Sequence, residues 1–483
     1  MIALLVSAVA LLIPSSASAF EPLLQFGTGA PGPGAGQLDN PTGVAVAPDG
    51  DVYVSEISND RISVFTPKAV FSRSFGGGQV GGPEGIAFGL DGTVYVAAAN
   101  TSRIAAFAAD GTFLRSFGGP GTGAGQLDAP TGLAVDPATG NVFVGDFFNN
   151  RIAVFSPAGA FLYAFGWDVV PGNGITVLEV CTTATGCKAG IGGGGVGQLD
   201  QPRHLAIDGA GNLFVASEPS MRITVFSTAG GFARAFGKDV IPGLPSNSEI
   251  CTTSCQTGTP GLAAGDLTGA AGVALAPSAG LYVTERDNDR VSLFSPQGDF
   301  IRAFGWDVIP GGAAGFEVCT AVTTCKDGVP GGGFGQLGMP FAAAMDCHGS
   351  VYVAEADRVQ KFGEPGVSDR SCLSNDFSFG KLKRHKRKGT ATLTVNVPAP
   401  GALVLAGKGL KPQRPGTQAA ISKTVSAAGK VKLLIKAKGR KKRKLSRTGK
   451  VKVKAKVTFT PTNGDPNKKS KRIKLRKSLR HRH

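Results

Sequence analysis

Histidine and helical periodicity are scarce in this sequence, and their scarcity excludes several classes of protein. The chain has 5 histidines in 483 residues, and only His204 and His348 lie before residue 380. Two histidines cannot form the multi-histidine centre of a zinc-dependent lyase. No long segment carries apolar residues at three- and four-residue spacing, so a mainly helical fold is excluded as well.

Long apolar runs are limited to the first residues of the chain, MIALLVSAVALLIPSSASAF. The run ends at Pro14, whereas a membrane span needs about 20 apolar residues. Ala17-Ser18-Ala19 follows as a small-x-small cleavage site, which predicts a secretory signal peptide over residues 1–19 despite the missing early Lys or Arg. We therefore expect a secreted or cell-envelope-associated protein.

Acidic residues are almost absent from the last part of the chain. From Lys381 onward there are 33 Lys and Arg and a single acid, Asp465, whereas the residues before it hold 18 bases and 33 acids. The formal net charge of +17 thus conceals an acidic body and a strongly basic C-terminal part. Partners of the two parts have to be considered separately.

Glycine, by contrast, is abundant, with 71 residues, and it punctuates a repeat. The segment GQLDNPTGVAVAPDGDVYVSEISNDRISVFTPKAVFSRSFG begins at Gly36, and close copies begin at Gly125 and Gly197. Shorter copies start near Val80, Gly265 and Gly335. One arginine marks the same place in every copy: Arg61, Arg103, Arg151, Arg222, Arg290 and Arg358.

Each copy contains four short β runs separated by turn residues, for example GVAVA, DVYVSE, RISVF and FSRSFG. Six such units predict an all-β fold, a six-bladed β-propeller over residues 20–365. The sixth unit lacks its fourth strand, and EPLLQFG, residues 21–27, resembles that strand. We expect the N-terminal strand to close the ring, because closure removes open sheet edges.

The recurring pattern of Pro-x-Gly-hydrophobic-Ala, Val-Tyr-Val, Arg-Ile-x-Val-Phe and a closing Phe-Gly resembles the NHL-repeat family over residues 21–363. The resemblance implies a six-bladed propeller used mainly for interaction or sensing. Some structurally related propellers are lyases or hydrolases, so the resemblance points to a fold more firmly than to a function.

Six of the eight cysteines form close pairs in the three longest connections between units. A chain that carries a signal peptide and an even number of cysteines favours disulfides. The expected pairs are Cys181/Cys187, Cys251/Cys255, Cys319/Cys325 and, on the opposite face, Cys347/Cys372. A four-cysteine zinc site assembled from two of these loops is the alternative. The spacings do not match a redox motif.

The three cysteine-containing loops and the neighbouring turns are expected to crowd one face of the propeller, near the mouth of its channel. The candidate residues for a binding face are Arg203, His204, Asn149, Asn150, Asp287 and Asn288. The recurring arginines, and the acids Glu56, Asp146, Glu285 and Glu355, are expected to hold neighbouring loops, because a catalytic group is usually unique. No nucleophile and base converge, so no catalytic residue and no cofactor is predicted.

The basic part, residues 379–483, follows a linker over residues 366–378. Apolar residues alternate with lysines in ATLTVNV, KVKLLIKAK and KVKVKAKVTFT. This alternation predicts a small Ig-like β-sandwich with lysines on its outer faces. Solvation of those faces is one interpretation, and attachment to anionic cell-envelope polymers is the other. Aromatic stacking residues are too few for a dedicated nucleic-acid site.

The first hypothesis for function is a secreted, monomeric binding propeller that recognises a protein, peptide or glycan on its loop-rich face and is held to the envelope by the basic domain. The alternative is a metal-assisted lyase or hydrolase at the channel mouth, working with Arg203, His204 and a bound divalent ion.

Overall fold

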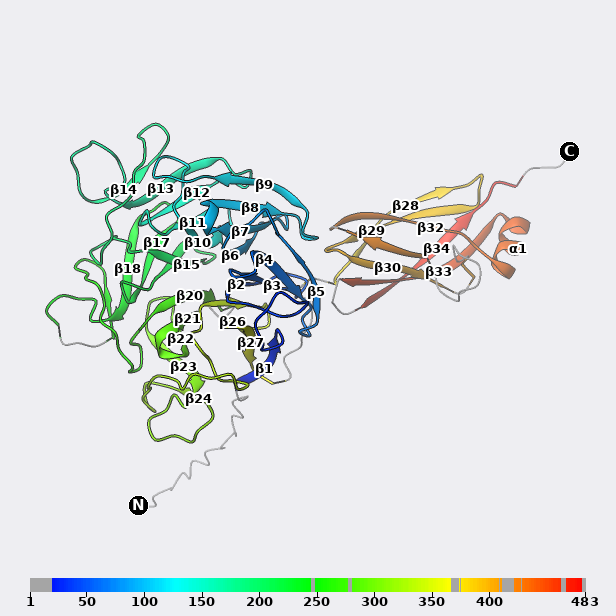
Figure 1. Cartoon of the computed structure of the whole chain (residues 1–483). Coiled ribbons are helices and arrows are strands. Elements are labelled where there is room, and N and C mark those ends of the chain that lie inside the picture. Colours follow the sequence, from blue (N-terminus) through cyan, green and yellow to red (C-terminus); the bar gives the residue numbers. More distant parts are fainter. Residues whose placement is uncertain are drawn as a thin grey trace, which may run out of the picture.

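The computed structural model describes residues 20–244, 248–276, 280–365, 373, 375–407, 409–410, 421–426, 428–461 and 466–479. It confirms an all-β chain (Figure 1). Helices in the described residues are limited to α1 (Gly439–Thr448) and the short 3-10 turns η1 (Ala99–Thr101) and η2 (Arg286–Asn288). No helix in these ranges has the length and the apolar character needed to cross a bilayer.

Six antiparallel sheets make up the body of the protein. The first consists of β2 (Pro41–Val46), β3 (Val52–Glu56), β4 (Arg61–Phe65) and β5 (Phe71–Phe75). The second consists of β6 (Pro83–Phe88), β7 (Val94–Ala98), β8 (Arg103–Phe107) and β9 (Phe113–Gly118). The third consists of β10 (Pro130–Val135), β11 (Val142–Asp146), β12 (Arg151–Phe155), β13 (Phe161–Trp167) and β14 (Leu178–Cys181).

The fourth sheet consists of β15 (Pro202–Ile207), β16 (Asn212–Ser217), β17 (Arg222–Ser227), β18 (Phe232–Lys238) and β19 (Ser248–Cys251). The fifth consists of β20 (Ala270–Leu275), β21 (Leu281–Glu285), β22 (Arg290–Phe294), β23 (Phe300–Trp306) and β24 (Phe316–Cys319). The sixth consists of β25 (Ala342–Met345), β26 (Val351–Glu355), β27 (Arg358–Gly363) and β1 (Glu21–Phe26). Strand β1 pairs with β27 at the place where the sequence predicts the missing fourth strand.

The burial of the strands explains the apolar pattern of each repeat. The second strands, such as Val52–Glu56, are buried along their whole length, because adjacent sheets cover both of their faces. The fourth strand of the first sheet alternates: in Phe71–Phe75 every second side chain is less exposed. Continuous apolar runs therefore mark inner strands and alternating runs mark outer strands.

The first strands of the six sheets contact one another in succession around a centre: β2, β6, β10, β15, β20, β25 and again β2 (Figure 1). This arrangement is that of a β-propeller. The approach between neighbouring first strands is close. A Cβ atom on Gly132 of β10 would lie 2.1 Å from the carbonyl oxygen of Arg203 on β15. Glycine is required there, because a side chain would push the two strands apart.

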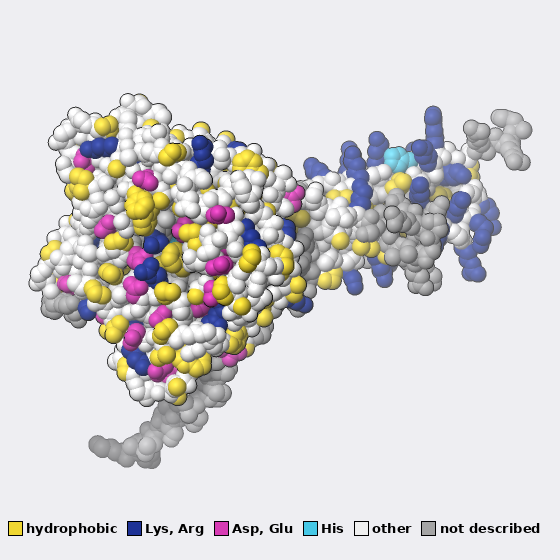
Figure 2. All heavy atoms as spheres, viewed as in Figure 1, with side chains coloured by type: hydrophobic (Ala, Val, Ile, Leu, Met, Phe, Trp, Pro, Cys, Tyr) yellow, Lys and Arg dark blue, Asp and Glu magenta, His cyan; other side chains and the backbone are white. Residues whose placement is uncertain are grey.

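Two further sheets form the C-terminal domain around one apolar core. One contains β28 (Ser378–His385), β29 (Thr390–Val397) and β32 (Gly429–Ile435). The other contains β31 (Ile421–Val425), β30 (Gly401–Ala406), β33 (Lys450–Pro461) and β34 (Asn467–Arg476). Many Lys and Arg side chains project from this domain, and no acidic side chain is visible among them in Figure 2.

Helix α1 is a departure from the sequence expectation of strands alone. Its sequence GRKKRKLSRT consists largely of Lys and Arg, and its one buried side chain, Leu445, joins the apolar core. Lys, Arg and Leu are good helix formers. The helix ends at Gly449, whose φ of 64° is the left-handed conformation that glycine adopts easily.

Candidate functional site

The recurring arginines bind the connecting loops of the body. Nε of Arg151 lies 2.8 Å from Oδ2 of Asp146, and both side chains are fully buried. Its terminal nitrogens donate to the carbonyl oxygens of Thr122 at 2.6 Å, before the third sheet, and of Lys188 at 3.0 Å, after it. Arg290 repeats the arrangement with Glu285 at 3.0 Å. Arg61, Arg222 and Arg358 likewise donate to loop carbonyls. Five of the six recurring arginines therefore hold loops, as their recurrence predicts, whereas Arg103 is exposed.

The three cysteine-containing segments add a fifth strand, β14, β19 or β24, to the outer edge of a sheet. Each segment contains a local disulfide: Cys181–Cys187, Cys251–Cys255 and Cys319–Cys325. The first cysteine of each pair lies opposite an alanine of the fourth strand, as Cys319 does opposite Ala303. The disulfides thus lie at the outer edges of the sheets. The segments therefore extend the outer edges of three sheets, away from the first strands around the centre.

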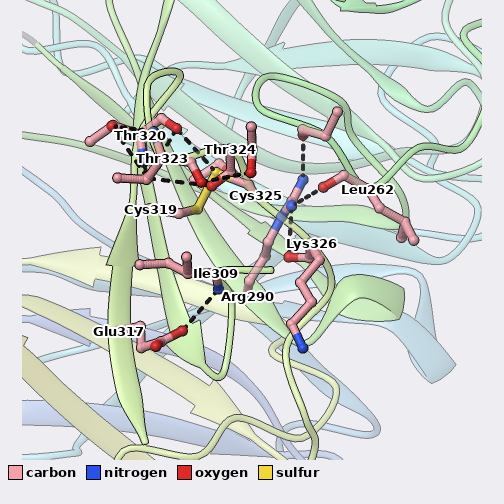
Figure 3. The surroundings of a disulfide bond; sticks show 12 residues. Leu262, Arg290, Ile309, Glu317, Cys319, Thr320, Thr323, Thr324, Cys325 and Lys326 are labelled. Atoms are coloured by element: carbon pink, nitrogen blue, oxygen red, sulfur yellow. Dashed lines mark hydrogen bonds between the residues drawn. A yellow bond between two sulfur atoms is a disulfide. The ribbon is translucent and has the colours of Figure 1, made fainter. Parts of the chain in front are cut away.

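Contacts around Cys319 and Cys325 fix the shape of one such segment (Figure 3). Oε2 of Glu317 accepts a hydrogen bond of 2.9 Å from the Ile309 backbone nitrogen. On the far side, Arg290 donates to the carbonyl oxygen of Lys326 at 3.0 Å. The returning backbone then passes beside the turn after β21, where Gly328 N donates to Asn288 O at 2.8 Å. The other two segments make the matching contacts, so all three are built on one plan.

The structure describes one of the two cysteines of the fourth predicted pair. Cys347 is disulfide-bonded, and its expected partner, Cys372, lies outside the described residues. In the described ranges, no group of three or more His, Cys, Asp or Glu side chains is arranged to hold a metal ion.

Two of the predicted face residues serve the fold. Asn149 and Asn288 are each 1% exposed. Nδ2 of Asn149 donates to Asp146 and to the Gly121 carbonyl, both at 2.9 Å, and Asn288 makes the equivalent contacts in the fifth sheet. They offer no side-chain surface to a ligand, which corrects the sequence interpretation. An asparagine three residues after the recurring acid was the signal for this role.

Asn150 and Asp287 differ from those two residues. Oδ1 of Asn150 accepts a hydrogen bond of 2.9 Å from the Gln201 backbone nitrogen, so its side chain also holds a loop. The side chain of Asp287 is 44% exposed and pairs with Arg286 at 3.2 Å. Of the four, Asp287 is the residue that presents most side-chain surface.

Arg203 is the centre of a charged and aromatic cluster at the end of the ring where the first strands begin. Its Cζ atom lies 4.8 Å from the ring centroid of Phe341 and 5.2 Å from that of Phe147. Its Nε lies 2.6 Å from Oε2 of Glu218, and the other oxygen of Glu218 lies 2.6 Å from Nη2 of Arg286. We call these five residues, Phe147, Arg203, Glu218, Arg286 and Phe341, the mouth cluster.

The cluster occupies equivalent positions of different repeats. Arg203 and Phe341 correspond to Thr42 and Thr131 in other sheets, whose hydroxyls donate to the backbone of the next sheet at 2.8 Å. In the first and third sheets this position therefore carries a small hydroxyl that joins two sheets. The fourth and sixth sheets carry Arg203 and Phe341 instead, and these two side chains contact each other.

His204 follows Arg203 and replaces the glycine found in four of the other five first strands, the sixth sheet having Ala342 there. Its Nδ1 lies 3.1 Å from the Ala271 carbonyl oxygen, and its Nε2 is enclosed without a hydrogen bond of good geometry. Burial lowers the pKa of His204 to about 4. The ring is therefore neutral at pH 7, and contact with a carbonyl favours the tautomer with the proton on Nδ1.

Glu84 is the equivalent of Arg203 in the second sheet. It is 8% exposed, and its Oε2 is enclosed without a hydrogen-bond partner. Burial raises the pKa of Glu84 to about 7, and the positive charge of Arg203 opposes that rise. The sequence analysis missed Glu84, Phe147, Glu218, Arg286 and Phe341. Aligning the six repeats and asking, at each position, which side chain differs in chemistry from the others would have found most of them.

One repeat of the body matches a known family. The family model described as NHL repeat matches residues 38–65. The chain carries an NHL repeat within a β-propeller. Curated protein sequences yield no match to it.

Several solved structures are similar to this chain. A streptogramin B lyase is 12% identical, with 72% of this chain and 99% of that chain covered and a TM-score of 0.44. A virginiamycin B lyase from Staphylococcus aureus is 12% identical, with 67% and 94% covered and a TM-score of 0.39. An auxiliary nutrient binding protein from Bacteroides ovatus is 13% identical, with 68% and 70% covered and a TM-score of 0.42.

Proposed function

We propose that this NHL-repeat protein is an extracellular binding propeller that recognises a protein or peptide through the mouth cluster. The observation that carries the proposal is Arg203 held between Phe147 and Phe341 and paired with Glu218. Arginine and aromatic residues at the centre of a partly buried patch are typical of sites that dominate protein–protein binding. Phe148, 57% exposed beside Phe147, extends the aromatic surface.

The architecture we propose around this site has six blades closed by β1 and followed by an Ig-like domain. The six sheets with successive contacts between their first strands support the blade number. The seven strands in two sheets around one core support an Ig-like sandwich. Three disulfides in the connecting loops favour an oxidising compartment, in keeping with the predicted signal peptide.

Selection from a peptide library on the immobilised full chain tests the binding site. Peptides selected on the wild type should lose at least about tenfold in affinity for the F147A variant, the scale of a central interface residue. The L114A variant is the control, because Leu114 is also exposed but lies on β9, an outer strand. Equal affinity for all three proteins would refute the mouth cluster as the site.

The basic domain is proposed to hold the protein to anionic polymers of the cell envelope. Its described residues contain one acid, Asp376, which pairs with Lys469 at 2.5 Å, so nearly all of its cations are available to an anionic surface. Co-sedimentation with cell walls tests this role. The variant without residues 375–483 should stay in the supernatant, and unchanged sedimentation would refute the tether.

A metal-assisted lyase or hydrolase at the channel mouth is the second candidate. One observation favours it: Glu84 and His204 are both enclosed, with the pKa of the acid raised and that of the base lowered. Such pairs can divide acid and base roles. Metal analysis of the purified protein separates the candidates, since a stoichiometric divalent ion favours the enzyme.

A further inference from the structure

Strands β33 and β34 present cations along one face of the C-terminal domain. Along β33, Val451 and Val453 are buried in the core while the alternate lysines are exposed, because successive strand residues point to opposite faces. Three exposed residues of β33 stand directly opposite three exposed residues of β34. We call these pairs the cationic ladder: Lys450 with Arg476, Lys452 with Lys474, and Lys454 with Arg472.

The register of the ladder is unfavourable for the isolated protein. Like charges directly opposite each other on a sheet destabilise the strand pair. In the described part of the chain, no carboxylate forms an ion pair with any ladder residue. The alternating pattern needs polar residues on this face but not cations, so solvation alone does not account for three facing pairs of one sign.

The shape of the ladder suits an extended chain of negative charges. Successive exposed residues along one strand are about 6.8 Å apart, and the two strands are about 4.8 Å apart. At the Lys450–Arg476 end, a hollow of about 480 Å³ is lined by both of these residues together with Lys474, Lys386 and Lys477. The row of cations thus continues into a concave site that carries two more.

We propose that the cationic ladder binds a linear polyol-phosphate polymer of the cell envelope, with successive phosphates along the two strands. The proposal rests on the tether function proposed above and names its ligand. A flexible phosphodiester chain can follow a straight double row of cations. The phosphates of duplex DNA wind away from such a row. Arg472 and Arg476 add planar guanidinium groups that can donate two hydrogen bonds to one phosphate.

The test measures binding of the full chain to poly(glycerol phosphate) over a range of salt concentrations. In the ladder variant K452Q/K454Q/R472Q/K474Q, the slope of log K against log[salt] should fall by roughly 3, about 0.7 for each lost phosphate contact. The matched control K441Q/K442Q/R443Q/K444Q removes four exposed cations from α1. Its slope should change by less than about 1. Equal losses in the two variants would overturn the ladder, because net charge alone would then explain binding.

Two further binding measurements identify the kind of molecule that carries the phosphate. Duplex DNA and vesicles containing anionic phospholipid are supplied at the same phosphate concentration. Poly(glycerol phosphate) should bind at least about tenfold more tightly than either, and tighter binding of DNA or vesicles would overturn the proposed ligand. Circular dichroism confirms folding, and the single variants K452Q and K474Q should show graded losses if the quadruple variant unfolds.

The ladder and the tether can fail separately. If deletion of residues 375–483 abolishes wall sedimentation and the ladder variant still sediments, the tether stands and the ladder is wrong. If the full chain binds poly(glycerol phosphate) through the ladder but deletion leaves sedimentation unchanged, the ladder stands and the tether is wrong.

Discussion

The guanidinium carbon of Arg203 lies 4.8 Å from the ring centroid of Phe341. Arg203 lies on β15 of the fourth sheet and Phe341 directly precedes β25 of the sixth, so their contact joins two sheets that are not successive in the ring. A cation over an aromatic ring contributes about 0.5–2 kcal/mol depending on its solvation. The contact therefore fixes the guanidinium close to Glu84, whose pKa it influences.

Replacing Arg203 with Gln should raise the pKa of Glu84 further above about 7, because the positive charge that opposes the rise is removed. Between its ordinary pKa of 4.5 and the raised one, Glu84 holds its proton in the folded chain more than in the unfolded chain. Stability contributed by this group is lost as pH rises through that interval, and R203Q should extend the loss to higher pH. NMR titration of the side-chain carboxyl groups measures the pKa of Glu84, and the E84Q variant identifies its signal. An unchanged or lower pKa in R203Q would contradict the prediction.

The H204N variant should reduce the acid sensitivity of the body. The folded-state pKa of His204 is about 4, below the ordinary 6.5, so the unfolded chain binds more protons between these values. Stability contributed by this group is present above about pH 6.5 and is lost as pH falls toward 4. The free energy of unfolding, measured with urea, should differ less between pH 7.5 and pH 5 in H204N than in the wild type. H348N, which removes the other histidine of the body, is the matched control, and equal differences in H204N and wild type would exclude the effect.

The Cys319–Cys325 disulfide should stabilise its own segment more than the whole fold. Closing so short a loop contributes about 2 kcal/mol in the chain-entropy model. In the variant C319A/C325A, a protease should cut the segment between the two positions faster than it does in the wild type. The rate of cleavage in the intact Cys181–Cys187 segment should not change and serves as the internal control. Mass spectrometry after alkylation should find no labelled cysteine in the unreduced wild type, and labelling there would contradict the disulfide.

The R290A variant should lose about 3–5 kcal/mol of unfolding free energy, because it leaves the fully buried carboxylate of Glu285 without its cation. The double variant E285M/R290M should recover part of the loss, since no buried charge is then unpaired. R103A is the control: Arg103 is exposed and Ala98 stands where the acid would be, so its change should stay within about 0.5 kcal/mol. Comparable losses of unfolding free energy in R290A and R103A would show that the buried ion pair contributes no more to stability than an exposed arginine does.

Several features of the fold were predictable because they depend on residues close together in the chain. The turn residues and apolar runs of each repeat predict the strands of the six sheets, and close spacing predicts the pairing of Cys251 with Cys255. Other features depend on residues far apart. Asn149 is polar and follows a turn, which suggests exposure, yet the carbonyl of Gly121 and the carboxylate of Asp146 enclose it. The fifth strands could not be foreseen from the cysteine spacing alone.

The sequence by itself determined that the chain is all-β, that its body is repetitive, and that lysines share one face of Lys450–Pro461. These properties follow from turn chemistry and from the two-residue period of a strand, which are local. Only the tertiary structure decided that Arg203, Phe147 and Phe341 meet, and that Lys452 stands opposite Lys474. The pairing of β1 with β27 and the register of the strands join distant segments. Which distant side chains become neighbours depends on the packing of the whole chain.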